Sequence, residues 1–188
     1  MSRKAAIVSF IYSCFFASGL ATADNRATEN SVPESVPVAY LEVSDVDYSR
    51  SLSSLIKNGH YQFVNPYIST GRVPVGGEGK VRVHFEVVEI DHPADLRVVL
   101  EKIAQRGLRP ATLAELLVYG LENPEKQVES PVVALGSRWQ LRYSGEYYPY
   151  LGNDSAGRTL DLLWNESART RWNSNYRFLA VREVRRFR

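Results

Sequence analysis

Cysteine is almost absent from this sequence. The 188 residues include one cysteine, Cys14, which lies in an apolar stretch with the pattern of a secretory signal. Two cations precede the apolar residues 5–20, and Ala21–Ala23 has the small-x-small form of a cleavage site. We therefore expect residues 1–23 to be a signal peptide that is removed. The remaining chain then has no disulfide, no thiolate nucleophile and no cysteine metal ligand.

A long hydrophobic run is also missing. The apolar stretch is short for a membrane span of about 20 residues, and no basic cluster follows it. Two alternatives to cleavage are a retained anchor and a lipoprotein attached through Cys14, although residues 11–13 match the lipoprotein consensus poorly. We expect an exported protein, located in the periplasm, on the cell surface or in the medium. No transmembrane span is expected after the signal is removed.

A net charge of one sign is absent once the signal is removed. The signal contains two of the 23 Lys and Arg residues and none of the 21 Asp and Glu residues. The rest of the chain therefore has 21 basic and 21 acidic residues. Export and a net charge of zero make nucleic-acid binding an unfavoured function.

The charges are nevertheless unevenly placed. Residues 138–188 hold ten arginines against five acids. We expect these arginines to pair with acids elsewhere in the chain or to lie in solvent. The alternative is a basic surface that docks onto an acidic polymer. Its members would be Arg169, Arg171, Arg185, Arg186 and Arg188.

Several catalytic motifs are missing as well. The histidines form no HxH or HExxH pair, no GxSxG element occurs, and Gly76–Gly79 is not followed by the Lys-Ser/Thr of a phosphate cradle. Ser137 follows a glycine, but no base can be assigned to it. Two of the loop carboxylates Asp154, Asp161 and Glu166 remain an alternative pair for glycoside hydrolysis. The sequence therefore favours a binding protein over an enzyme.

The rest of the chain reads as a flexible leader followed by one domain. Residues 24–37 are polar with two prolines, and residues 38–188 alternate between strand and helix patterns, so we expect a single α+β domain. Strands are expected at residues 38–43, 61–68, 81–87, 132–139, 147–151, 159–164 and 176–183. Pro66 places the second of these at a sheet edge.

Three helices are expected. Residues 49–58 and 94–106 place apolar residues on one helical face, and Gly59 and Gly107 provide their ends. Thr112 and Glu115 have the spacing of a capping box that opens a further helix through about residue 121.

The order of these elements resembles that of a C-type-lectin-like domain. Leu108–Leu116 is similar to the R-L-P-T-x-x-E stretch of bacterial and phage members, which include the formylglycine-generating-enzyme-like and major-paralogous-domain groups, and Tyr176–Arg182 is similar to their closing strand. Residues 61–188 also resemble a group of uncharacterised exported bacterial proteins. The resemblance implies two consecutive helices packed on antiparallel sheets, with the C-terminal strand closing the domain.

The chain departs from these families at the residues that carry their chemistry. The formylglycine-generating enzymes need cysteines, which the cleaved chain lacks. Calcium-dependent lectins pair Trp-Asn-Asp with an upstream Glu-Pro-Asn; here Trp164-Asn165-Glu166 is similar to the first, and no match to the second exists. We expect no cofactor, and a calcium site remains an alternative.

Aromatic residues are the strongest chemical signal, because they crowd into the last third of the chain among amides and carboxylates. Flat rings stack on sugars or apolar surfaces, and the polar groups orient the ligand. Strand alternation predicts that Trp139 and Trp164 lie in the core and that aromatics near turns lie on the surface. The candidate ligand-binding residues are Tyr148, Tyr150, Asn153, Asp154, Asn165, Arg171, Trp172 and Asn173.

These features predict an exported, non-catalytic binding module. It would recognise a polysaccharide or a protein ligand through the turns around residues 143–175. One alternative is a structural or assembly protein of the cell envelope that docks through its Arg-rich C-terminus. The other is a hydrolase that uses the loop carboxylates.

Overall fold

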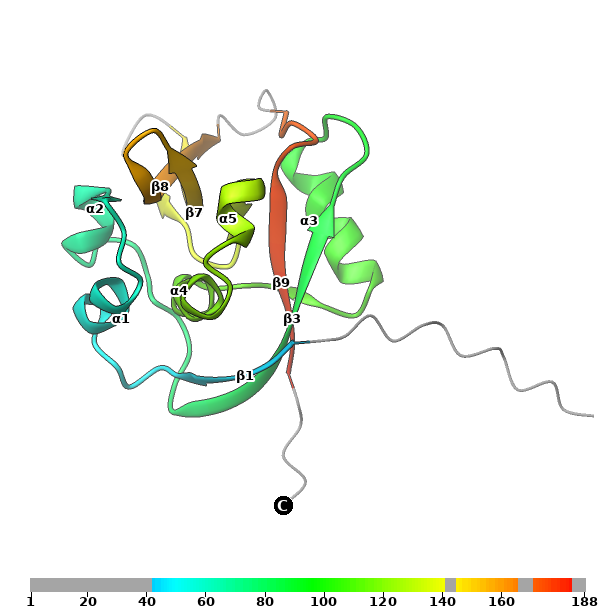
Figure 1. Cartoon of the computed structure of the whole chain (residues 1–188). Helices are drawn as coiled ribbons and strands as arrows, with labels where there is room; N and C mark the ends of the chain where they lie inside the picture. Colours follow the sequence, from blue (N-terminus) through cyan, green and yellow to red (C-terminus); the bar gives the residue numbers. More distant parts are fainter. Residues whose placement is uncertain (1–41, 141–144, 166–170, 184–188) are drawn as a thin grey trace, which may run out of the picture. The chain divides into compact units, whose positions relative to one another are not determined.

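The structure is a computed structural model that describes residues 42–140, 145–165 and 171–183 (Figure 1). The expected signal peptide and leader lie outside these residues. Glu166, Arg169, Arg185, Arg186 and Arg188 also lie outside them. Within the described residues, no helix has the length and apolar character that a membrane span requires.

The described strands join in one sheet. Their bounds are β1 Glu42–Asp47, β2 Phe63–Val64, β3 Lys80–Glu89, β4 Arg109–Pro110, β5 Val132–Val133, β6 Trp139–Gln140, β7 Glu146–Asp154, β8 Gly157–Asn165 and β9 Arg177–Glu183. The order along the sheet is β1-β3-β9-β5-β7-β8-β2, with β4 also paired to β9 and β6 to β7. The C-terminal strand β9 therefore lies inside the sheet, between β3 and β5.

The fold class is α+β, as the sequence predicts, but the sheet is mixed. Strands β2 and β8 are parallel, and so are β5 and β9, whereas the other pairs are antiparallel. The expectation of purely antiparallel sheets is therefore wrong. Strands β2 and β5 have two residues each, too few to show a periodicity, and each follows a helix. The route of the chain from that helix sets their direction.

The helices are α1 Leu52–Asn58, α2 Pro66–Ser69, α3 Leu96–Gln105, α4 Leu113–Glu122 and α5 Lys126–Glu129. Asp95 caps α3 by accepting a hydrogen bond from the backbone N–H of Val98 at 3.0 Å, and Gly107 follows its end with φ 68°. The capping box of α4 is present between Thr112 and Glu115. The two consecutive helices predicted by periodicity and caps are thus confirmed within two residues.

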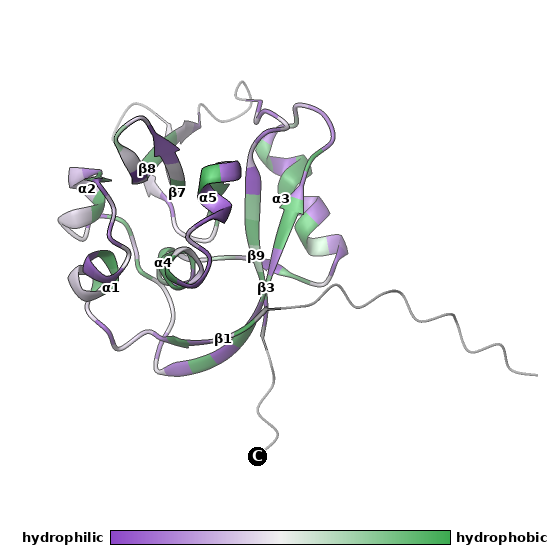
Figure 2. Cartoon of the chain, viewed as in Figure 1, coloured by the Kyte–Doolittle hydropathy of each residue, from purple (hydrophilic) through white to green (hydrophobic). Residues whose placement is uncertain are grey.

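Helices α3 and α4 lie on opposite sides of β3 and β9 (Figure 1). Alternating side chains of β9 explain this arrangement, because Leu179 and Val181 pack with α4 while Phe178 and Ala180 pack with α3. Helix α4 is buried from Leu113 to Gly120, whereas α3 exposes one face. Figure 2 shows that α3 contains both hydrophilic and hydrophobic residues.

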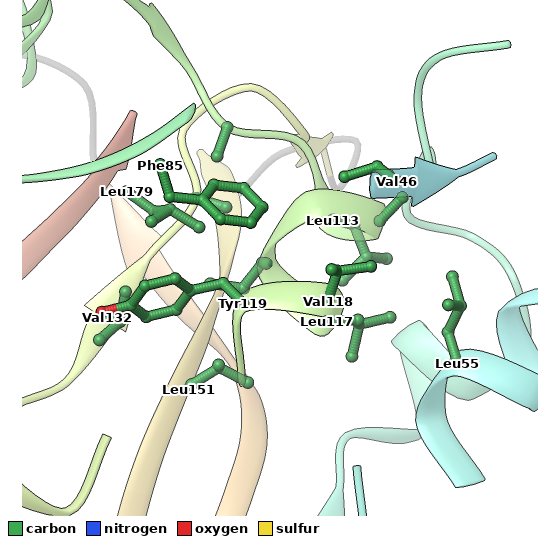
Figure 3. Packing of buried hydrophobic residues seen from close by; sticks show 14 of the residues in the cluster. Val46, Leu55, Phe85, Leu113, Leu117, Val118, Tyr119, Val132, Leu151 and Leu179 are labelled. Carbon is green, nitrogen blue, oxygen red and sulfur yellow. The ribbon is translucent and has the colours of Figure 1, made fainter. Parts of the chain in front are cut away.

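The core beside α4 is the larger of two hydrophobic clusters. Figure 3 shows Leu113, Leu117 and Tyr119 of α4 among residues of β1, β3, β7 and β9. The rings of Phe85 and Tyr119 meet edge to face with centroids 5.6 Å apart. In this core, one face of β7 and β8 packs against α4. The other face of these strands contains the site described below.

Some predicted strands are shorter or shifted. The expected strand 132–139 contains only β5 and β6, because the chain between them turns to pack against α4. The first strand lies at Glu42–Asp47 rather than at 38–43. The expected edge strand 61–68 is confirmed at the edge as β2, but Pro66 then begins α2.

Candidate functional site

Strands β7 and β8 form an antiparallel hairpin that closes through a turn at Ser155 and Ala156. The Oδ1 atom of Asp154 accepts hydrogen bonds from the backbone N–H groups of Ala156 at 2.8 Å and Gly157 at 3.2 Å. Gly157 has φ 126°, a conformation that favours glycine. The turn therefore fixes the position of the Asp154 carboxylate.

The register of the hairpin brings polar and aromatic side chains onto one face. Tyr150 is opposite Asp161, and Gly152 is opposite Thr159. Because side chains alternate along a strand, these four residues share a face. Leu151 and its cross-strand partner Leu160 point the other way, into the core.

A pocket of about 350 Å³ opens on this face. It is called the hairpin pocket below. Its lining residues are Phe63, Pro131, Tyr150, Gly152, Asn153, Asp154, Thr159, Asp161 and Tyr176. The hairpin thus supplies six of these nine residues, and β2 and the segments before β5 and β9 supply the others.

Three aromatic rings line the hairpin pocket. Phe63 is 44% exposed, and Tyr150 and Tyr176 are half-buried. Burial raises the pKa of Tyr150, and the nearby charges of Asp161, Tyr176 and Asp154 raise it further. The Tyr150 hydroxyl is therefore neutral at physiological pH and can both donate and accept a hydrogen bond.

Two carboxylates in the pocket are held by hydrogen bonds through one oxygen each. Asp161 Oδ1 accepts from the side-chain amide of Asn65 at 2.6 Å and from the backbone N–H of Leu162 at 2.7 Å. Asp154 Oδ1 is held by the turn described above. In the described parts of the chain, neither carboxylate forms an ion pair.

Gly152 lets Tyr150 and Thr159 approach the strand closely. A Cβ atom at Gly152 would lie 2.9 Å from Tyr150 Cε2 and 3.1 Å from Thr159 Oγ1, so a larger residue would displace these side chains. Thr159 is 7% exposed, and its hydroxyl has no hydrogen-bond partner among residues 42–140, 145–165 and 171–183. The backbone carbonyl of Gly152 accepts from Gln127 Nε2 at 2.5 Å, which fixes the strand behind the pocket.

The structure brings together some of the residues predicted from the sequence and separates others. Tyr150, Asn153 and Asp154 meet in the hairpin pocket. Arg171 and Asn173 are exposed but do not line it. Tyr148, Asn165 and Trp172 are buried.

Tyr148 and Trp172 were expected on the surface, and that placement is wrong. Trp172 is 1% exposed and meets the rings of Tyr148, Tyr176 and Phe178 edge to face. Its backbone also forms an isolated bridge to Ala94. Proximity to a turn misled the prediction, because this turn lies over the second hydrophobic cluster.

The expectation of buried tryptophans at 139 and 164 also needs correction. Trp164 is 46% exposed, although it alternates with residues on the core face of β8. Trp139 is partly buried and stacks on Tyr67 with ring centroids 4.4 Å apart. The core face of the hairpin is therefore buried along only part of its length.

Asn165 lines a second, larger pocket of about 680 Å³ between α3 and the start of the hairpin. Its carboxamide is buried, and neither polar atom has a hydrogen-bond partner among the residues that the structure describes. Glu166, the third member of the calcium-like tripeptide, lies outside the described residues. Within the described ranges, no group of three His, Cys, Asp or Glu side chains is placed to hold a metal ion.

Ser137 has a structural role. Its hydroxyl donates to the carbonyl of Pro74 at 2.6 Å and accepts from the backbone N–H of Leu113 at 2.9 Å. The side chain is buried at the start of α4. The Ser137 hydroxyl therefore acts as both donor and acceptor, and it joins the loop that contains Pro74 to the start of α4.

Sequence reasoning missed Phe63, Gly152 and Thr159 as members of the site. The signal for Thr159 is present in the sequence, since a hairpin closed at residues 155 and 156 places it opposite Gly152. Phe63 carries no such signal, because only the parallel pairing of β2 with β8 brings it to the pocket. Comparison of the chain with protein-family models, curated proteins and solved structures gives no match.

Proposed function

We propose that this protein is an exported, non-catalytic binding module that recognises a polysaccharide through the hairpin pocket. The observation that carries the proposal is the lining of that pocket. Aromatic rings, carboxylates, an amide and a threonine hydroxyl surround one cavity on a hydrogen-bonded hairpin.

This combination suits a sugar residue. The apolar C–H face of a sugar ring packs on an aromatic side chain, and its hydroxyl groups donate to carboxylates and accept from amides. The volume of about 350 Å³ is near the lower end of small-molecule sites, roughly 300–1,000 Å³. The pocket therefore suits one unit or a short segment of a chain rather than a broad protein surface.

We also propose that the domain is C-type-lectin-like. The support is the antiparallel pair of β3 and β9, with the consecutive helices α3 and α4 following β3. The parallel pairs and the additional strands β1 and β2 are departures from the expected antiparallel arrangement. Export rests on the signal-like pattern of residues 1–23.

Replacing Tyr150 with alanine is expected to weaken polysaccharide binding about two- to tenfold, because stacking on an aromatic ring is worth roughly 0.5–1.5 kcal/mol. Gly152→Ala is expected to weaken it as well, because the added methyl group would displace the ring of Tyr150 and the hydroxyl of Thr159. Titration calorimetry with peptidoglycan fragments and bacterial polysaccharides measures both effects. Tyr67→Ala is the matched control, since Tyr67 is an exposed aromatic that does not line the pocket.

Three results contradict the proposal. The first is the absence of saturable binding to every polysaccharide tested, which would favour a protein ligand. The second is equal binding by the Tyr150 variant and the Tyr67 control. The third is turnover of the oligosaccharide that stops in Asp161→Asn, which would assign the carboxylates to hydrolysis.

A further inference from the structure

We propose that the hairpin pocket selects a sugar that carries a free, positively charged amino group. This inference rests on the proposed function and names its ligand class. The observation behind it is the presence of two carboxylates, with no cationic partner among the described residues, in a pocket that also contains aromatic rings.

The lining of the pocket includes Asp154 and Asp161 and contains no lysine, arginine or histidine. Several other acids of the described domain have cationic partners, such as Glu86 with Arg106, Glu146 with Arg138, and Asp91 with Lys102. Among the described residues, neither pocket carboxylate has such a partner, so a cationic ligand would meet two carboxylates that no described cation neutralises.

The arginines nearest in sequence are directed elsewhere. The guanidinium of Arg158 donates to the carbonyls of Gly59 at 2.7 Å and Gly120 at 2.5 Å, and it lies over the ring of Tyr61. Arg177 pairs with Glu89 at 2.8 Å. The fold therefore keeps both cations out of a pocket that lies directly beside them in sequence.

The carboxylates are also oriented for a ligand. Each has its Oδ1 atom held by two N–H donors, while no hydrogen bond within the described residues uses its Oδ2 atom. An ammonium group provides N–H donors for such oxygens, and charge-assisted hydrogen bonds are the strong ones. The Thr159 hydroxyl, which has no hydrogen-bond partner in the described part of the chain, is an additional acceptor.

The aromatic rings favour the same ligand class. A cation beside the face of a tyrosine or phenylalanine ring is attracted by the ring quadrupole, and more strongly where water is displaced. Phe63, Tyr150 and Tyr176 provide such rings in this pocket. An anionic sugar would instead meet two like charges without a counterion.

The test compares two oligosaccharides that differ only in the amino group. A hexamer of β-1,4-linked glucosamine carries ammonium groups, and its N-acetylated counterpart is neutral. We expect the protein to bind the amine-bearing hexamer at least tenfold more tightly at pH 6, and we expect added salt to reduce this preference. Titration calorimetry measures both affinities.

Variants locate the source of the preference. Asp154→Asn combined with Asp161→Asn preserves the shape of each side chain and an acceptor oxygen, and it is expected to reduce the preference to about twofold or less. Asp91→Asn is the matched control, because Asp91 is an exposed acid outside the pocket. Circular dichroism melting checks that each variant folds, and the single Asp161→Asn variant provides the same comparison if the double variant unfolds.

The outcomes separate this inference from the proposed function. Equal affinity for the two hexamers, or binding of only neutral glycans, overturns the charge selection and leaves polysaccharide binding in place. A preference that persists in the folded double variant, or that Asp91→Asn removes equally, overturns the role of the pocket carboxylates. Binding to no polysaccharide of any charge overturns both proposals.

Discussion

Replacing Trp172 with alanine is expected to lower the free energy of unfolding by about 3–5 kcal/mol, the usual cost of truncating a large buried aromatic side chain. Trp172 is 1% exposed and packs edge to face against Tyr148, Tyr176 and Phe178. Alanine would leave a cavity among three rings that hold one another in place. Urea denaturation followed by circular dichroism measures the loss.

Trp164→Ala is the matched control. This tryptophan is 46% exposed, so its removal is expected to change the free energy of unfolding by less than about 1 kcal/mol. Equal losses in the two variants would contradict the assignment of Trp172 to the core. A Trp172 variant that keeps full stability but loses ligand binding would restore its original interpretation as a surface contact.

Replacing Glu115 with alanine is expected to lower the free energy of unfolding by about 1.5–3 kcal/mol, because it removes a buried carboxylate and leaves Tyr48 and the 36% exposed side chain of Arg109 without their acceptor. Glu115 is fully buried and accepts two hydrogen bonds from Arg109, at 2.6 and 2.9 Å. It also accepts from the Tyr48 hydroxyl at 2.5 Å and the backbone N–H of Thr112 at 2.7 Å. One carboxylate thus joins the residue that follows β1, strand β4 and the start of α4.

The same group predicts a pH dependence. Burial alone would raise the pKa of Glu115, but hydrogen bonds from Arg109, Tyr48 and Thr112 together with the Arg109 charge hold it below its ordinary value of 4.5. Because the pKa of Glu115 is lower in the folded state than in the unfolded state, its ionised carboxylate stabilises the fold fully above about pH 4.5. This stabilisation is lost as the pH falls through the pKa of the folded state. Urea denaturation at pH 7 and pH 3 is expected to show a smaller acid-induced loss in Glu115→Gln than in the unsubstituted protein.

Glu101→Ala is the control for both measurements. Glu101 pairs with Arg97 at 2.7 Å on the exposed face of α3, and such helix pairs contribute only about 0.3–0.5 kcal/mol. A Glu115 variant that is no less stable than the Glu101 variant would contradict the structural role of the buried pair. An equal acid-induced loss in Glu115→Gln and the unsubstituted protein would contradict the lowered pKa.

The parts of the fold that local sequence predicted are those with a local physical cause. The glycine at 107 and the capping box of Thr112 and Glu115 act within a few residues, so they mark the end of α3 and the start of α4 reliably. The alternation of residues 81–87 likewise identifies β3. In contrast, the parallel pairs of β2 and β5 join residues about 95 and 45 positions apart, which no local pattern encodes.

The candidate site was predictable only in part. The hairpin register connects Tyr150, Asn153 and Asp154 through neighbouring residues, and the turn between β7 and β8 is marked by Gly157. Trp172 gave no comparable signal, because it lies outside a long strand and its burial depends on β7 and β9. Phe63 reaches the pocket only through the pairing of β2 with β8.

The amino-acid sequence by itself determined the α+β class, the consecutive helices, the hairpin and the gathering of aromatic and polar residues near its turn. Tertiary structure alone decided which aromatics are buried and which line the pocket. It also decided that Arg158 and Arg177 are bound elsewhere, while no described cation pairs with Asp154 or Asp161. The physical reason is that hydrogen bonding and periodicity are local, whereas burial and charge pairing depend on residues that only the folded chain brings together.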